Sequence, residues 1–87
     1  MDVVTVMRER LQGLAPEQIE ITDESAAHAG HAGAARGGGH YHLTIVAACF
    51  AGENRVARHR RIYTALGDLV PARIHALGID ALTPDEL

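Results

Sequence analysis

The chain has 87 residues and a mass of 9.3 kDa, which suits a single domain over residues 1–87 and excludes a second hydrophobic core. No apolar run reaches the roughly 18 residues of a membrane span, and the first residues match neither a secretory signal nor a transit peptide. The single cysteine, Cys49, excludes an internal disulfide and favours a reducing compartment, so we expect a cytoplasmic protein without membrane contact. The net charge of −3 argues against indiscriminate nucleic-acid binding, although residues 25–61 carry five arginines and one glutamate.

The N-terminal segment predicts a helix followed by a strand. Apolar residues recur every three or four positions over residues 3–14, which is typical of an amphipathic helix, and Asp2 is a suitable N-cap. Pro16 lies just beyond the end of this helix. Gln18–Asp23 then alternates apolar and polar residues, which predicts a half-buried strand.

The middle of the chain predicts a loop and a longer strand. Residues 24–39 are mostly Ala, Gly, His and Arg, a composition that buries too little apolar area to offset its ordering entropy, so we expect a flexible loop. His40–Phe50 alternates again, with Tyr41 on the apolar side and His42 on the polar side. Cys49 is predicted to be a small core residue of this strand.

The C-terminal part predicts a helix over residues 55–69, capped by Asn54 and interrupted at Gly67, and a last strand over Ile74–Leu82. Residues 83–87 form a polar tail or the start of a short helix. The helix side predicted to face the core holds Val56, His59, Ile62, Tyr63, Leu66 and Val70. The outer flank holds Arg55, Arg58 and Arg61.

These elements follow one another in the order α-β-β-α-β. The first two strands should pair antiparallel across the loop, and the helical crossover makes the second and third strands parallel. With both helices on one face, the predicted fold is a two-layer α+β domain with a three-stranded mixed sheet.

Several short motifs then identify a family. In chain order they are Asp23-Glu24-Ser25 with His28, His40-Tyr41, Phe50-Ala51-Gly52, Arg58-His59-Arg60 and Ile74-His75-Ala76-Leu77. Together they resemble BolA-like proteins, from the first predicted helix to about Pro84. The resemblance implies an α-β-β-α-β fold similar to the type II KH fold, in agreement with the order above. Two positions depart from the family pattern: Arg61 stands where an apolar residue is usual, and Gly39 stands where Ser or Thr is common.

Two functions follow from the resemblance. BolA-like proteins pair with monothiol glutaredoxins through a shared [2Fe–2S] cluster, for which one ligand comes from the loop and the other from the His-Ala-Leu segment. Carried over, these ligands are His75 and His28, with His31 as a substitute. Two imidazoles on one iron raise its reduction potential and make ligation sensitive to protonation. The glutaredoxin cysteine and glutathione would supply the thiolates, so we expect no cofactor on the isolated chain.

The second implied function is DNA binding in transcriptional regulation. The arginines of the predicted helix that would meet phosphate groups are Arg55, Arg58, Arg60 and Arg61. The competing interpretation is a solvated helix flank whose arginines pair with acidic residues of the same chain.

The remaining histidines favour structural roles. His59 falls within the apolar stripe of its helix, which predicts a buried structural residue. His40 and His42 have a metal-chelating spacing, but such a pair is more typical of an exposed polar face. The loop histidines and His75 have the corresponding alternative of being ordinary solvated or locally hydrogen-bonded side chains. No catalytic constellation is apparent, and we predict that the protein is not an enzyme.

Overall fold

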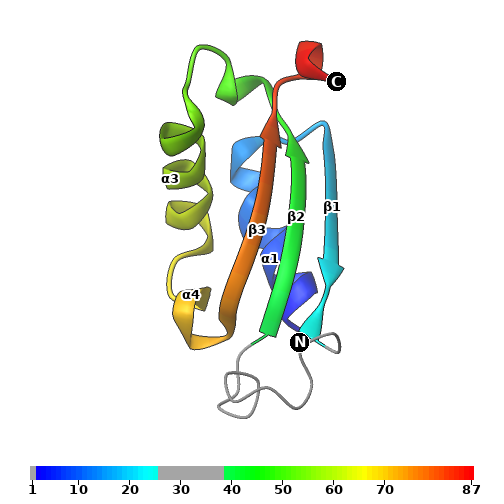
Figure 1. Ribbon diagram of the computed structural model, residues 1–87, viewed down its shortest axis with the longest axis vertical. Coiled ribbons are helices and arrows are strands. Elements are labelled where there is room, and N and C mark those ends of the chain that lie inside the picture. Colours follow the sequence, from blue (N-terminus) through cyan, green and yellow to red (C-terminus); the bar gives the residue numbers. More distant parts are fainter. Residues whose placement is uncertain (1, 26–38) are drawn as a thin grey trace.

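Helices α1 and α3 pack on one face of a three-stranded sheet in the computed structural model, which describes residues 2–25 and 39–87 (Figure 1). The helices and strands are α1 (Val3–Leu11), β1 (Gln18–Asp23), β2 (Gly39–Val46), α3 (Arg55–Leu66), α4 (Leu69–Ala72) and β3 (Ile74–Leu82). Short 3₁₀ turns cover Gln12–Leu14, Ala48–Phe50 and Pro84–Glu86. The predicted α-β-β-α-β order and the two-layer α+β architecture are confirmed.

The sheet has the order β1-β2-β3, so β2 is the central strand. β1 runs antiparallel to β2, with Ile19 opposite Ile45. β3 runs parallel to β2, with Ile79 opposite Leu43. Both pairings are those that the connection lengths predicted.

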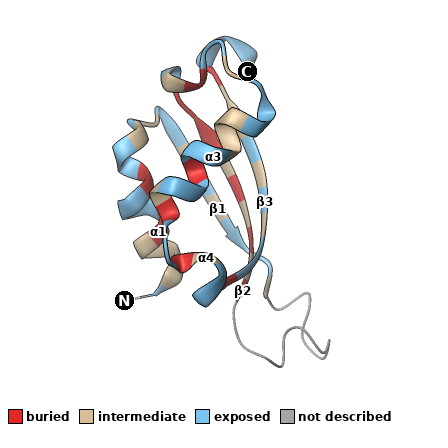
Figure 2. Cartoon of the chain, turned by 90° about the vertical axis from the view of Figure 1, so that its left-hand side faces the viewer, coloured by how far each residue is buried: buried red, intermediate tan, exposed pale blue. Residues whose placement is uncertain are grey.

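The core lies between the sheet and the two helices (Figure 2). Its large, fully buried side chains are Met7, Leu11, Leu43, Ile45, Phe50, Ile62, Leu66 and Ile74. Successive side chains of a strand point to opposite faces, so the even-numbered residues of β2, from His40 to Thr44, lie on the outer face of the sheet. Helices α1 and α3 leave that outer face uncovered (Figure 2).

The structure shortens two of the predicted elements. The first helix becomes a 3₁₀ turn after Leu11, and β2 ends at Val46 instead of continuing to Phe50. The Phe50 N–H donates to the Ala47 carbonyl at 3.3 Å, and this turn directs the Phe50 ring into the core, where a continued strand would have carried it past the sheet. Cys49, in the same turn, is half-buried against the core.

The core-facing side of α3 is narrower than predicted. Ile62 and Leu66 are fully buried, but Val56 is 57% exposed, Tyr63 is 41% exposed and His59 is only half-buried. Each residue turns an α-helix by about 100°, which places Val56 and Tyr63 at least that far around the axis from Ile62. The prediction that Val56 and Tyr63 face the core is therefore wrong, and His59 is half-buried where full burial was predicted. The predicted interruption at Gly67 is confirmed, since α3 ends there and α4 follows.

None of the helices in the described residues is both long and apolar enough to cross a membrane.

Candidate functional site

His75 occupies an irregular position at the start of β3. Gly39 pairs with Ile74, but the next residue of β2, His40, pairs with Ala76. His75 is therefore the additional residue of a β-bulge, a feature that redirects side chains and is frequent beside functional sites. Ile74 is fully buried, whereas His75 is exposed.

The bulge brings the imidazole of His75 next to that of His40. The two ring centroids are 5.1 Å apart, and the ring planes are tilted by 50°. Because His40 lies on the outer face of β2, this pair of imidazoles marks the outer face of the sheet where β2 and β3 begin.

The same end of the sheet holds both described ends of the connection between β1 and β2. The His40 N–H donates to the Ser25 Oγ at 3.0 Å, and the Glu24 N–H donates to the His40 carbonyl at 2.7 Å. The Gly39 N–H donates to the Arg73 carbonyl, next to β3, at 3.0 Å. The connection predicted to carry the loop ligands therefore leaves and re-enters the sheet close to His75.

Tyr41 packs under this end of the sheet. Its ring is almost fully buried, and this burial, followed by the charge of Asp23, raises the pKa of the Tyr41 hydroxyl above its ordinary value. A Cβ on Gly39 would overlap the Tyr41 ring. A side chain at position 39 would therefore require the Tyr41 ring to move.

His42 is committed to a different contact. Its Nε2 lies 2.8 Å from the Asp80 Oδ2, and its ring covers Gly78, where a Cβ would approach the Nδ1 to 2.7 Å. His40 and His42 thus face different partners and do not form the chelating pair that their spacing allows. Within residues 2–25 and 39–87, no group of three or more His, Cys, Asp or Glu side chains is arranged to hold a metal ion.

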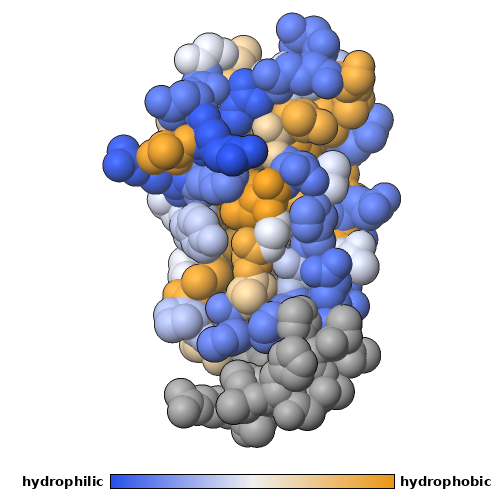
Figure 3. Space-filling model, viewed as in Figure 1, coloured by the Kyte–Doolittle hydropathy of each residue, from blue (hydrophilic) through white to orange (hydrophobic). Residues whose placement is uncertain are grey.

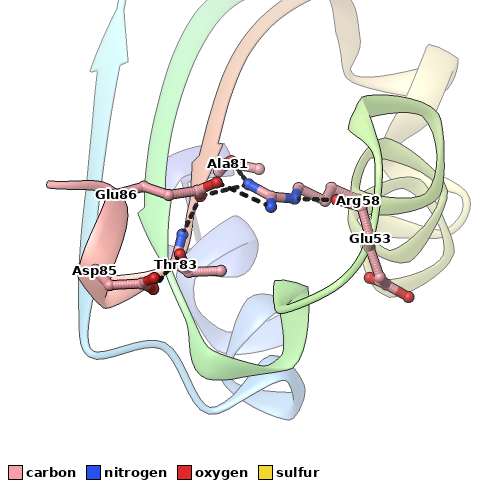
Figure 4. Close-up of polar contacts among 6 residues, drawn as sticks. All are labelled: Glu53, Arg58, Ala81, Thr83, Asp85 and Glu86. Carbon is pink, nitrogen blue, oxygen red and sulfur yellow. Dashed lines mark hydrogen bonds and ion pairs between the residues drawn. The ribbon is translucent and has the colours of Figure 1, made fainter.

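Arg58 lies inward, contrary to its predicted place on the outer flank of α3. Its side chain is only 14% exposed, and its guanidinium donates to the carbonyls of Glu53 and Ala81, each at 2.9 Å, and to both carboxylate oxygens of Glu86 at 2.6 and 3.1 Å (Figure 4). The Arg58 guanidinium, together with the Thr83 N–H, lowers the pKa of Glu86 to about 2. Arg58 therefore fastens the C-terminal turn to α3.

The other arginines of α3 divide into two groups. Arg61 donates to the Glu53 carboxylate at 2.6 Å. Arg55 and Arg60 are exposed, and neither has an acidic partner among the described residues. Of the four arginines predicted to meet phosphates, only these two remain available for an external anion.

A cavity of about 340 Å³ lies between α3 and β3, next to Arg58. It is lined by Glu53, Arg55, Arg58, His59, Ile79, Asp80, Ala81, Leu82 and Glu86. His59, predicted to be buried in the core, is thus half-buried on one wall of a cavity.

Comparison with protein families agrees with this arrangement. A family model described as BolA-like protein matches residues 11–86, which is most of the chain. The chain belongs to the BolA-like family.

The chain is similar to proteins from a plant and a bacterium. The chain is 41% identical over 87 residues to SufE-like protein 1, chloroplastic/mitochondrial, of Arabidopsis thaliana, covering 93% of this chain and 24% of that protein. It is 31% identical to the DNA-binding transcriptional regulator BolA of Haemophilus influenzae, covering 99% and 82% of the two chains. The solved BolA domain of Arabidopsis SufE1 superimposes with a TM-score of 0.84 at 38% identity, covering 100% and 99% of the chains. The chain thus spans about a quarter of the full Arabidopsis protein.

Two of the predicted cluster ligands, His28 and His31, lie outside the described residues. The roles of His28 and His31 remain predictions. The structure describes the position of His75, but ligation of iron by His75 also remains a prediction.

Sequence reasoning missed the contact between Arg58 and the C-terminal turn. A signal for the turn was present: Thr83 followed three residues later by Glu86 is a capping-box pattern, with Pro84 in the first turn. The Thr83 N–H donates to the Glu86 carboxylate at 2.7 Å, so residues 83–87 begin with a capped turn, which was one of the two predicted alternatives. Nothing local indicated that Arg58 would lie beside it.

Proposed function

We propose that this BolA-like protein is an iron–sulfur adaptor that binds a monothiol glutaredoxin and contributes His75 to a shared [2Fe–2S] cluster. The observation that carries the proposal is the position of His75: exposed, on a bulge, and at the end of the sheet where the β1–β2 connection begins and ends. A second histidine from that connection, His28 or His31, would then reach the same iron.

A shared site needs few donors from this chain. The described residues include no three-ligand group, whereas a bridging cluster needs only one or two donors from this chain. The partner's cysteine and glutathione would supply thiolates. We place this adaptor in the cytoplasm, consistent with the single cysteine, and assign it no catalytic step.

His75 would act as a neutral imidazole that binds iron through one ring nitrogen. Because a protonated imidazole has no free electron pair, iron and a proton would compete for that ring nitrogen. His40, packed against the His75 ring, would restrict the orientations that this ring can adopt.

The proposal is tested by mixing the protein with a cluster-loaded monothiol glutaredoxin in the presence of glutathione and recording visible absorption and circular dichroism. The native protein is expected to change both spectra, and His75→Ala should abolish or alter that change. His42→Ala is the matched control, since it removes an imidazole from the same sheet face. Identical spectra for His75→Ala and the native protein would exclude His75 as a ligand.

The second candidate function is DNA binding. It is favoured by the exposed Arg55 and Arg60, and by the name of the Haemophilus relative, a DNA-binding transcriptional regulator. With only two arginines of α3 available, log Kd should change with log salt concentration by a slope of about 2 in magnitude. An affinity for duplex DNA that is independent of salt, or unchanged in Arg55→Ala/Arg60→Ala, would contradict this function.

A further inference from the structure

One side of α3 carries apolar side chains that remain uncovered by the described part of the chain. Val56, His59 and Tyr63 follow one another at intervals of three and four residues, so they lie along one side of the helix. Val56 and Tyr63 are, with Leu87, the large hydrophobic residues found exposed. His59 lines the cavity between α3 and β3, so this stripe borders the cavity.

The opposite wall of the cavity is the free edge of β3. Within the described sheet, β3 pairs with β2 on one side only. The Leu82 carbonyl accepts from the Ala47 N–H and therefore points toward β2, whereas the Ala81 carbonyl accepts from Arg58 on the other side. Backbone groups of successive strand residues point to opposite edges, so Ile79, like Ala81, directs its N–H and carbonyl toward α3.

An edge of this kind is a template for a further strand. The Arg58 guanidinium occupies the edge of β3 at Ala81. At Ile79, no side chain of the described residues forms a hydrogen bond to the backbone of this edge. Figure 3 shows apolar surface running between polar side chains over α3 and polar side chains over the outer face of the sheet. Ile79 and Leu82 contribute apolar lining to the cavity there.

The charges around the cavity between α3 and β3, called the groove below, indicate the charge of a suitable partner. Three carboxylates line the cavity and each has a partner: Glu53 pairs with Arg61, Glu86 with Arg58, and Asp80 with the His42 ring. The unpaired cations are those of Arg55, which lines the cavity, and of Arg60, on the adjoining surface of α3. The groove therefore combines an apolar surface, backbone donors and acceptors, and two arginines that have no acidic partner among the described residues.

We propose that the groove between α3 and β3, defined by Val56, His59 and Tyr63 on one wall and Ile79–Leu82 on the other, binds an extended segment of a partner protein that carries acidic side chains. The segment adds to the edge of β3 at Ile79, in the manner of β-strand addition, and its carboxylates meet Arg55 and Arg60. Its apolar side chains cover Val56 and Tyr63. This interaction uses neither His75 nor a metal, and it stands independently of the cluster proposal.

Nucleic acid fits this groove less well than a peptide does. A DNA backbone would satisfy the two arginines but would leave the apolar stripe and the backbone groups of Ile79 without a matching partner. An extended peptide satisfies all three, because its main chain pairs with the strand edge while its side chains alternate between the two walls.

The test is an NMR titration of the full ¹⁵N-labelled chain with a short capped peptide of alternating valine, threonine and glutamate. A peptide with lysine in place of each glutamate is the control probe. We expect amide shifts concentrated in β3 around Ile79 and in α3, with the acidic peptide only. Arg55→Glu should weaken binding about tenfold, whereas Arg8→Glu, the same charge change on α1, should leave it unchanged. Tyr63→Ser should also weaken binding without lowering the melting temperature.

Four results would overturn the proposal: no shifts with the acidic peptide, equal binding of the two peptides, equal effects of Arg55→Glu and Arg8→Glu, or shifts that map elsewhere on the surface. A short DNA duplex that displaces the peptide and shifts the same amides more strongly would assign the groove to nucleic acid instead. Loss of glutaredoxin-dependent spectral changes in His75→Ala has no bearing on this outcome, so failure of one proposal is distinguishable from failure of the other.

Discussion

Replacing Thr83 tests whether the C-terminal turn is a structural part of the domain. Thr83 is only 4% exposed and precedes the turn Pro84–Glu86. Its Oγ1 lies 2.6 Å from the Asp85 carboxylate, and its N–H donates to the Glu86 carboxylate that Arg58 also holds (Figure 4). Thr83→Ala removes the capping hydroxyl and a buried methyl group, so the turn should detach from α3 more readily.

The size of the effect follows from these two losses. An N-cap hydroxyl contributes about 1 kcal/mol to the free energy of unfolding, and a buried methyl group contributes about 0.8 kcal/mol. Thr83→Ala should therefore cost about 2 kcal/mol, out of about 5–8 kcal/mol for a domain of this size. Thr83→Ser keeps the hydroxyl and should cost only about 0.8 kcal/mol.

Thermal unfolding followed by circular dichroism measures both variants. For a domain of this length, Thr83→Ala should lower the melting temperature by roughly 8–16 °C, and Thr83→Ser by less than half as much. If Thr83→Ala has the same melting temperature as the native protein, the turn contributes nothing to stability. If Thr83→Ser loses as much as Thr83→Ala, the methyl group rather than the cap accounts for the loss.

Two further predictions concern ion pairs. Because the pKa of Glu86 is about 2 in the folded chain and 4.5 in an unperturbed carboxyl, its pairing with Arg58 stabilises the fold above pH 4.5 and is lost as the pH falls through 2. Urea unfolding at a series of pH values should show stability falling over this range, with a flatter profile for Glu86→Gln; parallel profiles would refute the assignment. Gly78→Ala should push the His42 ring off Asp80 at little cost in stability, since the ring ends a flexible side chain. The His42 ring ¹³C shifts should then match those of Asp80→Asn, and unchanged shifts would contradict the contact.

Hydrophobic periodicity was sufficient to predict the fold. Gln18–Asp23 and Ile74–Leu82 are strands with the predicted bounds: the first alternates through its whole length, and the second is followed directly by Thr83 and Pro84. The end of β2 was not predictable in this way. Residues 47–50 are all apolar, so the pattern does not distinguish a strand from a turn there.

The candidate site was less accessible to sequence reasoning. His75 was singled out only through the resemblance to BolA-like proteins, since one histidine at the start of a strand has no distinctive pattern. Its contact with His40 depends on a bulge in the pairing of two strands that are distant in the sequence. The inward position of Arg58 depends likewise on Glu86, which lies 28 residues away in the chain. Such long-range partners leave no trace in local periodicity.

The two proposed surfaces lie along the same strand, which permits one partner to use both. His75 and Ile79 are four residues apart in β3, a distance of about 13 Å at the rise of a β-strand. A single small domain can span this separation. If the glutaredoxin also supplies the acidic segment, Arg55→Glu should weaken its binding in the absence of iron, while His75→Ala should weaken only the cluster-loaded complex. Calorimetry with and without the cluster separates the two effects. If Arg55→Glu binds the iron-free glutaredoxin as tightly as the native protein does, the glutaredoxin complex forms without the groove. The groove would then serve a different partner.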